Sequence, residues 1–158
     1  MTASQSNGLG QVCDWMSRNP VTVSLACPVA QVVRVMVAQG IRHVLVMDGE
    51  RLDGIVSNRD LRSLLIDAEP HVFPSSPVSR VMTESPVTVS PDASLTDAAR
   101  AMLEGKIGAL PVVEGGRPVG ILTRSDALEA LLAWVEAGGA PRRGPIASRA
   151  DRPESAPD

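Results

Sequence analysis

Aromatic residues are almost absent from the 158-residue chain: Trp15, Phe73 and Trp134 are the only ones, and there is no tyrosine. A core without aromatics has to be built from Val, Leu, Ile, Ala and Met. The aromatic platforms on which many proteins stack single-stranded nucleic acid are missing as well. The composition therefore excludes that mode of nucleic-acid binding.

Positive charge is also scarce. Lys106 is the only lysine, the arginines are dispersed, and the formal net charge is −3. Binding to a phosphate backbone depends on clustered Lys and Arg. No stretch approaches the roughly 20 apolar residues that span a bilayer, and residues 1–10 lack the basic and apolar regions of a signal peptide. We therefore expect a cytoplasmic protein with no nucleic-acid partner and no membrane partner.

Residues suited to metal binding and catalysis are few and scattered. Cys13 and Cys27 have no CxxC spacing, so neither a disulfide framework nor a zinc site is indicated, and buried or incidental thiols are expected. His43 and His71 are the only histidines, whereas catalysis needs reactive groups that converge. The GxSxG, HExxH and P-loop motifs are absent. We expect no enzyme, no catalytic residue and no metal; a metal or redox role for these four residues is a distant alternative.

What the chain does contain is an internal repeat. A shift of 66 positions superimposes residues 16–61 on residues 82–127 without a gap. A gapless match of this length predicts two copies of one structural unit. Among the matched pairs are Thr22 with Thr88, Met36 with Met102, Gly54 with Gly120, Ile55 with Ile121, and Asp60 with Asp126.

Each copy has the pattern of a βαββα unit. A short β-branched strand opened by proline comes first, at 20–24 and 86–90, and a helix follows. Ser94 and Asp97 fit a capping box at the start of the second of these helices. The helices carry apolar stripes at helical spacing: Val29, Val32, Val33, Met36 and Val37 in the first copy, and Leu95, Ala98, Ala99, Met102 and Leu103 in the second.

Two strands around a tight turn and a closing helix complete each copy. A unit of about 50 residues cannot bury both faces of its sheet alone. We therefore predict an α/β (α+β) protein in which two βαββα units pack with pseudo-twofold symmetry. The predicted parts are a flexible N-terminus (1–11), a first unit (12–66), a connector (67–77), a second unit (78–137) and a disordered tail (138–158).

The candidate site is a run at the end of the third strand of each copy, Gly54 to Asp60 and Gly120 to Asp126. It has glycine, two aliphatic residues, a hydroxyl residue, two variable positions and aspartate. A helix N-terminus holds phosphate well, and a carboxylate in the first turn can accept hydrogen bonds from both ribose hydroxyls. The same pairs, Ser57 with Asp60 and Thr123 with Asp126, also fit capping boxes that only stabilise the helix. The two roles can coexist.

The order of elements and the repeated Gly-x-x-Ser/Thr-x-x-Asp run resemble a tandem cystathionine-β-synthase (CBS) domain pair, or Bateman module, of the stand-alone kind. The resemblance covers roughly residues 12–135. It implies a regulatory module that binds AMP, ADP, ATP or S-adenosylmethionine in a cleft between the copies, forms a homodimer and controls a partner protein. A ligand-free interaction or dimerisation module is the alternative.

The resemblance also implies composite sites. One site would combine Thr123, Arg124 and Asp126 with Thr22, Ile41, Arg42 and His43; the other would combine Ser57, Arg59 and Asp60 with Thr88, Ile107, Gly108 and Ala109. On this pairing the first site has more positive charge, so we expect it to bind nucleotide more tightly than the second. Arg124 would bind the phosphate groups there. The alternatives stay open that Arg42 is a solvated surface cation and that His43 is an ordinary strand-end histidine. Leu45 stands where Pro111 matches the family pattern, so the first copy departs from that pattern in its second strand.

The closing helices carry further apolar residues. Two uses of these side chains stay open: an interface with a second copy, or cover for the protein's own sheet. They are Leu61, Leu64 and Leu65 in the first copy, and Ala127, Leu128, Leu131, Leu132 and Val135 in the second.

Overall fold

The computed structural model describes residues 8–67 and 74–139. The mixed α/β class predicted from the sequence is confirmed. The chain divides into two compact units, which we describe separately. The first-repeat unit comprises Pro20–Val87 and Glu114–Pro118, and the second-repeat unit comprises Met1–Asn19, Thr88–Val113 and Val119–Asp158.

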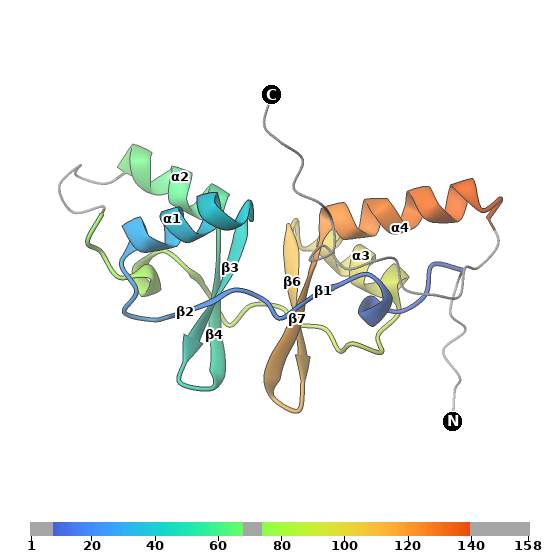
Figure 1. The fold of residues 1–158 in the computed structure, drawn as a ribbon, viewed down its shortest axis with the longest axis horizontal. Coiled ribbons are helices and arrows are strands. Elements are labelled where there is room, and N and C mark those ends of the chain that lie inside the picture. The colour runs from blue at the N-terminus through green and yellow to red at the C-terminus, as the bar shows by residue number, and fades with distance from the viewer. Residues whose placement is uncertain (1–7, 68–73, 140–158) are drawn as a thin grey trace. The chain divides into compact units, whose positions relative to one another are not determined.

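The first-repeat unit is built on a four-stranded sheet with the order β2-β3-β4-β5. The pair β2–β3 is parallel and the other two pairs are antiparallel. The helices α1 and α2 lie together along the β3–β4 hairpin (Figure 1). The elements are β2 (Thr22–Ser24), α1 (Val29–Gln39), β3 (His43–Asp48), β4 (Arg51–Ser57), α2 (Asn58–Asp67), a 3-10 helix (Val78–Arg80) and β5 (Thr83–Glu84).

The second-repeat unit repeats this plan with a three-stranded sheet of order β1-β7-β6. Its helix α4 packs on α3 (Figure 1). The elements are a 3-10 helix (Val12–Asp14), β1 (Ser17–Arg18), α3 (Leu95–Glu104), β6 (Ala109–Glu114), β7 (Arg117–Thr123) and α4 (Arg124–Glu136).

The strand predicted at 86–90 is reduced to a single bridge between Val89 and Val112. In the first copy, the Leu45 N–H donates to the Val21 carbonyl at 3.0 Å and helps to hold β2 against β3. The corresponding residue of the second copy is Pro111, which has no N–H to donate. The loss of this donor explains why the second copy lacks a counterpart of β2.

The segment that precedes the first predicted strand of each copy, which we call its leading segment, packs in the unit that is built mainly from the other copy. The short strand β1, from the first copy, pairs with β7 through Ser17↔Ile121, and β5, from the second copy, pairs with β4 through Ile55↔Thr83. Val12 belongs to the core of the second-repeat unit. Val78, 66 positions later, belongs to the core of the first-repeat unit, and both valines are 0% exposed. The sequence repeats are contiguous, but the compact units are not.

A methionine in each leading segment rests on a glycine of the strand that it meets. A Cβ built on Gly54 would lie 2.5 Å from the Met82 sulfur, and a Cβ on Gly120 would lie 2.6 Å from the Met16 sulfur. The nearest backbone oxygens, from Thr83 and Ser17, would be 3.0 and 2.9 Å away. Glycine is therefore required at both positions so that the exchanged segment can approach the strand.

The helical stripes are confirmed in part. Val29, Val32 and Met36 are buried in α1, but Val37 is 77% exposed and its counterpart Leu103 is 76% exposed. Val37 and Leu103 directly follow the buried Met36 and Met102, and successive residues of a helix point roughly 100° apart, so these two side chains lie off the buried face. The prediction of a Ser94–Asp97 capping box is wrong, because the Ser94 side chain accepts no hydrogen bond from the helix backbone.

The backbone repeats even where the side chains differ. Asn19 and Ser85 occupy equivalent positions and have φ values of 52° and 46°. Gly40 caps the C-terminus of α1, its counterpart Lys106 follows the C-cap Gly105 of α3, and the two have φ values of 61° and 53°. A non-glycine residue is uncommon in this left-handed region, so the fold imposes the helix-to-strand turn on Lys106.

Parts of the predicted termini and connector, residues 1–7, 68–73 and 140–158, lie outside the described residues. Across the described parts, no helix is long and apolar enough to cross a membrane.

The exchange of leading segments predicts where a core mutation acts. Val78→Ala removes buried methyl groups and should lower the free energy of unfolding by about 2 kcal/mol. In hydrogen exchange, the loss of amide protection should concentrate on α1, β3 and β4, which precede Val78 in the sequence. Val12→Ala is the matched control and should deprotect α3, β6 and β7. Deprotection of each variant's own repeat instead would contradict the exchange.

Candidate functional site

In each unit the start of one strand, β3 or β6, which we call its strand entrance, lies beside the start of the closing helix. In the first-repeat unit the Asn58 N–H donates to the Arg42 carbonyl at 2.9 Å. His43 is the register partner of Ser57 in the β3–β4 ladder. We call the residues 41–43 and 57–60 the Asp60 edge.

The second-repeat unit has an equivalent edge, in which the Arg124 N–H donates to the Gly108 carbonyl at 3.1 Å. We call residues 107–109 and 123–126 the Asp126 edge. Both edges arise because the last strand of each copy runs directly into its closing helix, β4 into α2 and β7 into α4. The strand entrances that the sequence singled out therefore lie beside the carboxylate-bearing helix of their own copy.

The predicted capping boxes are present on both edges. The Ser57 N–H and Oγ–H both donate to Asp60 Oδ2 at 2.7 Å, and the Asp60 N–H donates back to Ser57 Oγ at 3.3 Å. For Thr123 and Asp126 the corresponding distances are 2.7, 2.8 and 3.3 Å. Each carboxylate is thereby held rigidly at the positive end of a helix.

The two carboxylates differ in their surroundings. Asp126 is 6% exposed, and it is the one buried charged residue among those that the structure describes. Asp60 is half-buried. Within the described residues, the hydrogen bonds of Asp60 all involve Oδ2 or the backbone, so Oδ1 has no partner there. A fixed acceptor with an unused oxygen is suited to a ligand hydroxyl group.

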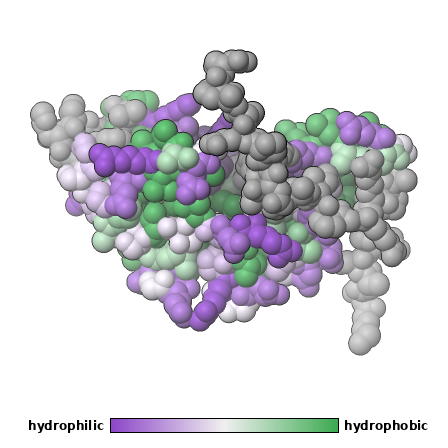
Figure 2. Space-filling view, viewed as in Figure 1, coloured by the Kyte–Doolittle hydropathy of each residue, from purple (hydrophilic) through white to green (hydrophobic). Residues whose placement is uncertain are grey.

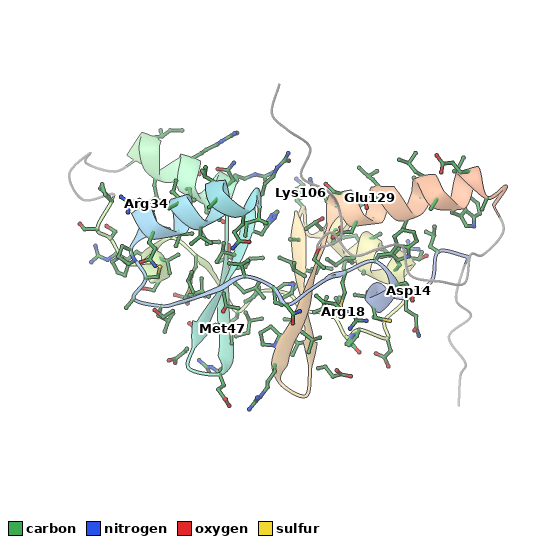
Figure 3. The ribbon with its side chains drawn as sticks, viewed as in Figure 1. Asp14, Arg18, Arg34, Met47, Lys106 and Glu129 are labelled. Atoms are coloured by element: carbon green, nitrogen blue, oxygen red, sulfur yellow. The ribbon has the colours of Figure 1, made fainter. Side chains whose placement is uncertain are left out.

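Both edges carry basic side chains, which differ in their hydrogen bonds. Arg42 and Arg59, on the Asp60 edge, are exposed. On the Asp126 edge, the Arg124 Nε–H donates to the Ile107 carbonyl at 3.0 Å, which ties one side of this guanidinium to the strand entrance. Lys106 lies in the turn just before this entrance (Figure 3). Sequence reasoning missed Lys106, although its alignment with Gly40 marks it as a charge found in one copy only.

The isoleucines near the starts of β3 and β6, Ile41 and Ile107, both have backbone N–H groups that are already hydrogen-bonded within the protein. The Ile41 N–H donates to the Met36 carbonyl at 3.0 Å, and the Ile107 N–H donates to the Met102 carbonyl at 2.9 Å. Both side chains are half-buried. Each edge therefore presents the aliphatic side chain of its own isoleucine and not an unused backbone N–H.

The remaining predicted residues fall in the same two groups. Thr22 is exposed at the start of β2 in the first-repeat unit, and Thr88 is exposed in the second-repeat unit with Gly108 and the buried Ala109. The structure thus brings Arg42 and His43 together with Ser57 and Asp60. The sequence-derived sets instead combined residues from the two units, and those combinations stay a prediction.

The thiols are unsuited to chemistry. Burial raises the pKa of the Cys27 thiol, and burial followed by the nearby Asp14 carboxylate raises the pKa of Cys13. A raised pKa lowers the fraction of reactive thiolate at neutral pH. In the described ranges, no group of three His, Cys, Asp or Glu residues is placed to hold a metal ion. His71 lies outside those ranges.

The family model described as CBS domain matches this chain twice, at residues 11–67 and 78–133. The chain belongs to the CBS domain family. Both matches include the exchanged leading segments, and they end in the closing helices. The tandem CBS pair that the repeat suggested is therefore confirmed.

Relatives with this CBS pair vary in length. The chain is 30% identical over 133 residues to a CBS domain-containing protein of Dictyostelium discoideum, covering 77% of this chain and 90% of that one. It is 36% identical over 116 residues to an uncharacterized 33.4 kDa protein in the ribosomal RNA operon of Thermofilum pendens, covering 73% of this chain but 37% of that protein.

Among solved structures, the CBS pair resembles CBSX2 in complex with AMP. The TM-score is 0.69 and the identity is 32%, with 78% of this chain and 97% of that chain covered. The likeness therefore extends over nearly the whole of CBSX2.

The capping role of the edges can be measured without a ligand. Thr123→Val removes the hydroxyl that accepts from the Asp126 N–H, and it should lower the free energy of unfolding by about 1 kcal/mol in urea denaturation. Thr96→Val, in the first turn of α3, where the N-cap Ser94 makes no side-chain cap hydrogen bond, is the control and should change stability less. Equal effects of the two substitutions would argue against a structural role for the box.

Proposed function

We propose that this CBS pair is a regulatory module that binds an adenine nucleotide. The observation that carries the proposal is the capped carboxylate at a helix N-terminus beside a strand entrance, present once in each unit. The likeness to CBSX2, whose structure contains AMP, supports it. A module kept only for assembly would need the caps but would have no use for the unpartnered Oδ1 of Asp60.

In this proposal each polar group of the Asp60 edge has a role. Asp60 Oδ1 accepts a hydrogen bond from a ribose hydroxyl, and the Ile41 side chain contacts the base. Arg42 and Arg59 bind the phosphate groups, because both guanidinium groups are exposed and have no hydrogen-bond partner among the described residues. Paired guanidinium donors match phosphate oxygens well.

This assignment revises the preference derived from the sequence. The sequence favoured the site of Asp126 because it grouped Arg42 and His43 there, but the Asn58 N–H donates to the Arg42 carbonyl and His43 pairs with Ser57, which supports grouping both residues with the Asp60 edge. Arg124 also uses its Nε–H within the protein. We therefore assign the more highly phosphorylated nucleotide to the Asp60 edge, and an adenosine ligand of lower charge, such as S-adenosylmethionine, to the Asp126 edge.

This proposal contains no chemical step, so the role it gives the module is regulation by ligand binding. The edges supply acceptors, cations and apolar walls, which bind a ligand but do not transform it. A bound ligand changes a partner's activity only if it binds two states of the module with different affinity. We propose control of a partner protein in the cytoplasm on this basis, with a ligand-free assembly module as the competing function.

Calorimetric titration with AMP, ATP and S-adenosylmethionine tests the proposal. We expect saturable binding of at least one nucleotide, with affinity about tenfold or more weaker in Asp60→Ala, because charge-assisted hydrogen bonds are lost. Asp60→Asn keeps a side-chain acceptor and serves as the milder variant. Glu104→Ala, exposed at the end of α3, is the control and should bind normally.

The absence of saturable heat with all three ligands in the folded wild-type protein would favour the assembly module. Binding that is unchanged in both Asp60 and Asp126 variants would remove the capped carboxylates from the site.

A further inference from the structure

The Asp60 edge contains a histidine to which the proposed function gives no role. His43 is the one histidine among the residues that the structure describes, and an ordinary histidine side chain has a pKa of about 6.5. Its counterpart in the other copy is Ala109, which is 3% exposed and does not titrate. One edge therefore has a group whose charge changes near neutral pH, whereas the other edge has no histidine.

The position of His43 in the sheet places its side chain beside that of Ser57. Val44 and Val46 belong to the core that β3 shares with α1 and α2. Successive side chains of a strand point to opposite faces, so His43 lies on the face away from these helices. In the β3–β4 ladder His43 is the register partner of Ser57, and directly opposite residues share a face with Cβ atoms roughly 5 Å apart. The imidazole ring is therefore a neighbour of the capping box.

The same edge carries one carboxylate and two guanidinium groups. The Ser57 Oγ–H donates to Asp60 Oδ2 at 2.7 Å, so a single side chain lies between His43 and this carboxylate. Arg59, in the first turn of α2, and Arg42, directly before β3, are both exposed. The carboxylate stabilises a protonated His43, and the guanidinium groups oppose protonation. An anionic ligand bound among these groups would shift the balance toward the protonated ring.

The other elements packed against β3 present neutral residues near His43. On β2, Thr22 pairs with Leu45, and α1 ends in Gln39. Arg62, which follows Arg59 after about one turn of α2, is a third cation near this edge. The charged residues of the β3–β4 turn lie at the far end of β3, roughly 17 Å away, where Figure 2 shows hydrophilic surface.

We propose that His43 makes nucleotide binding at the Asp60 edge dependent on pH, because its protonated ring joins Arg42 and Arg59 in binding the phosphate groups. This role rests on the proposed function, since it concerns the same ligand and the same edge. A bound anion stabilises the charged ring, so nucleotide binding takes up a proton and raises the pKa of His43. The contribution of His43 to affinity is therefore present at pH 6 and lost by pH 8.

Calorimetric titration with AMP at pH 6 and pH 8 compares the wild-type protein with His43→Ala, which introduces the residue that the other copy has at this position. The phosphate of AMP itself titrates near pH 6, but it does so for both proteins, so the ratio of their dissociation constants isolates His43. We expect His43→Ala to bind AMP roughly five- to tenfold more weakly than the wild type at pH 6, and about equally well at pH 8.

Two further variants separate charge from shape. His43→Gln keeps a polar side chain that does not titrate, and it should behave as His43→Ala does. His71→Ala removes the other histidine of the chain and should bind AMP as the wild type does at both pH values. Circular dichroism at both pH values checks that each variant is folded.

A His43 that only positions the strand entrance would give the same ratio of dissociation constants at pH 6 and pH 8. That result overturns the inference and leaves the proposed function standing. The absence of saturable AMP binding to the folded wild-type protein at both pH values removes the proposed function and the role of His43 with it.

The titration of His43 itself is a readout that a positioning role would not move. The chain has two histidines, so its NMR spectrum contains two sets of imidazole resonances, which His71→Ala assigns. Saturation with AMP should raise the pKa of His43 by roughly one pH unit and leave that of His71 unchanged. A pKa of His43 that is the same in the free and the AMP-saturated protein overturns the inference.

Discussion

The reciprocal exchange of leading segments is the constraint on which the rest of this structure depends. Val12 and Val78 are each completely buried in the core built by the other copy. Met16 and Met82 rest on Gly120 and Gly54, where any side chain would clash. A repeat taken alone would lack a core valine and an edge strand, so neither copy is complete without the other.

This constraint reaches the candidate site through the strands. The short strand β5 pairs with β4 at Gly54 and Ile55, two residues before Ser57. The strand then passes directly into α2, where Ser57 and Asp60 close the capping box. The same sequence of contacts leads from β1 through β7 to Asp126. Each carboxylate thus follows a strand that pairs with the leading segment of the other copy.

The sequence predicted most of the fold and the two capped carboxylates, because a gapless repeat makes each element visible twice. It could not predict the exchange, since nothing in a periodic pattern tells a leading segment which copy it packs on. For the same reason the sequence could not show that the start of β3 lies beside the start of α2, as the bond from the Asn58 N–H to the Arg42 carbonyl shows. The sets that combine residues of the two copies stay a prediction. Helical spacing identified the apolar residues of α4, but only the structure separated the buried Ala130 from the exposed Leu128, Leu131 and Leu132.

The central claim is that the capped carboxylates mark the ligand site, and backbone amide chemical shifts of ¹⁵N-labelled protein during AMP addition test it most directly. The account predicts saturable shift changes centred on residues 41–43 and 57–60, with smaller changes at 107–109 and 123–126. Saturable changes elsewhere, with these two edges unaffected, would contradict it.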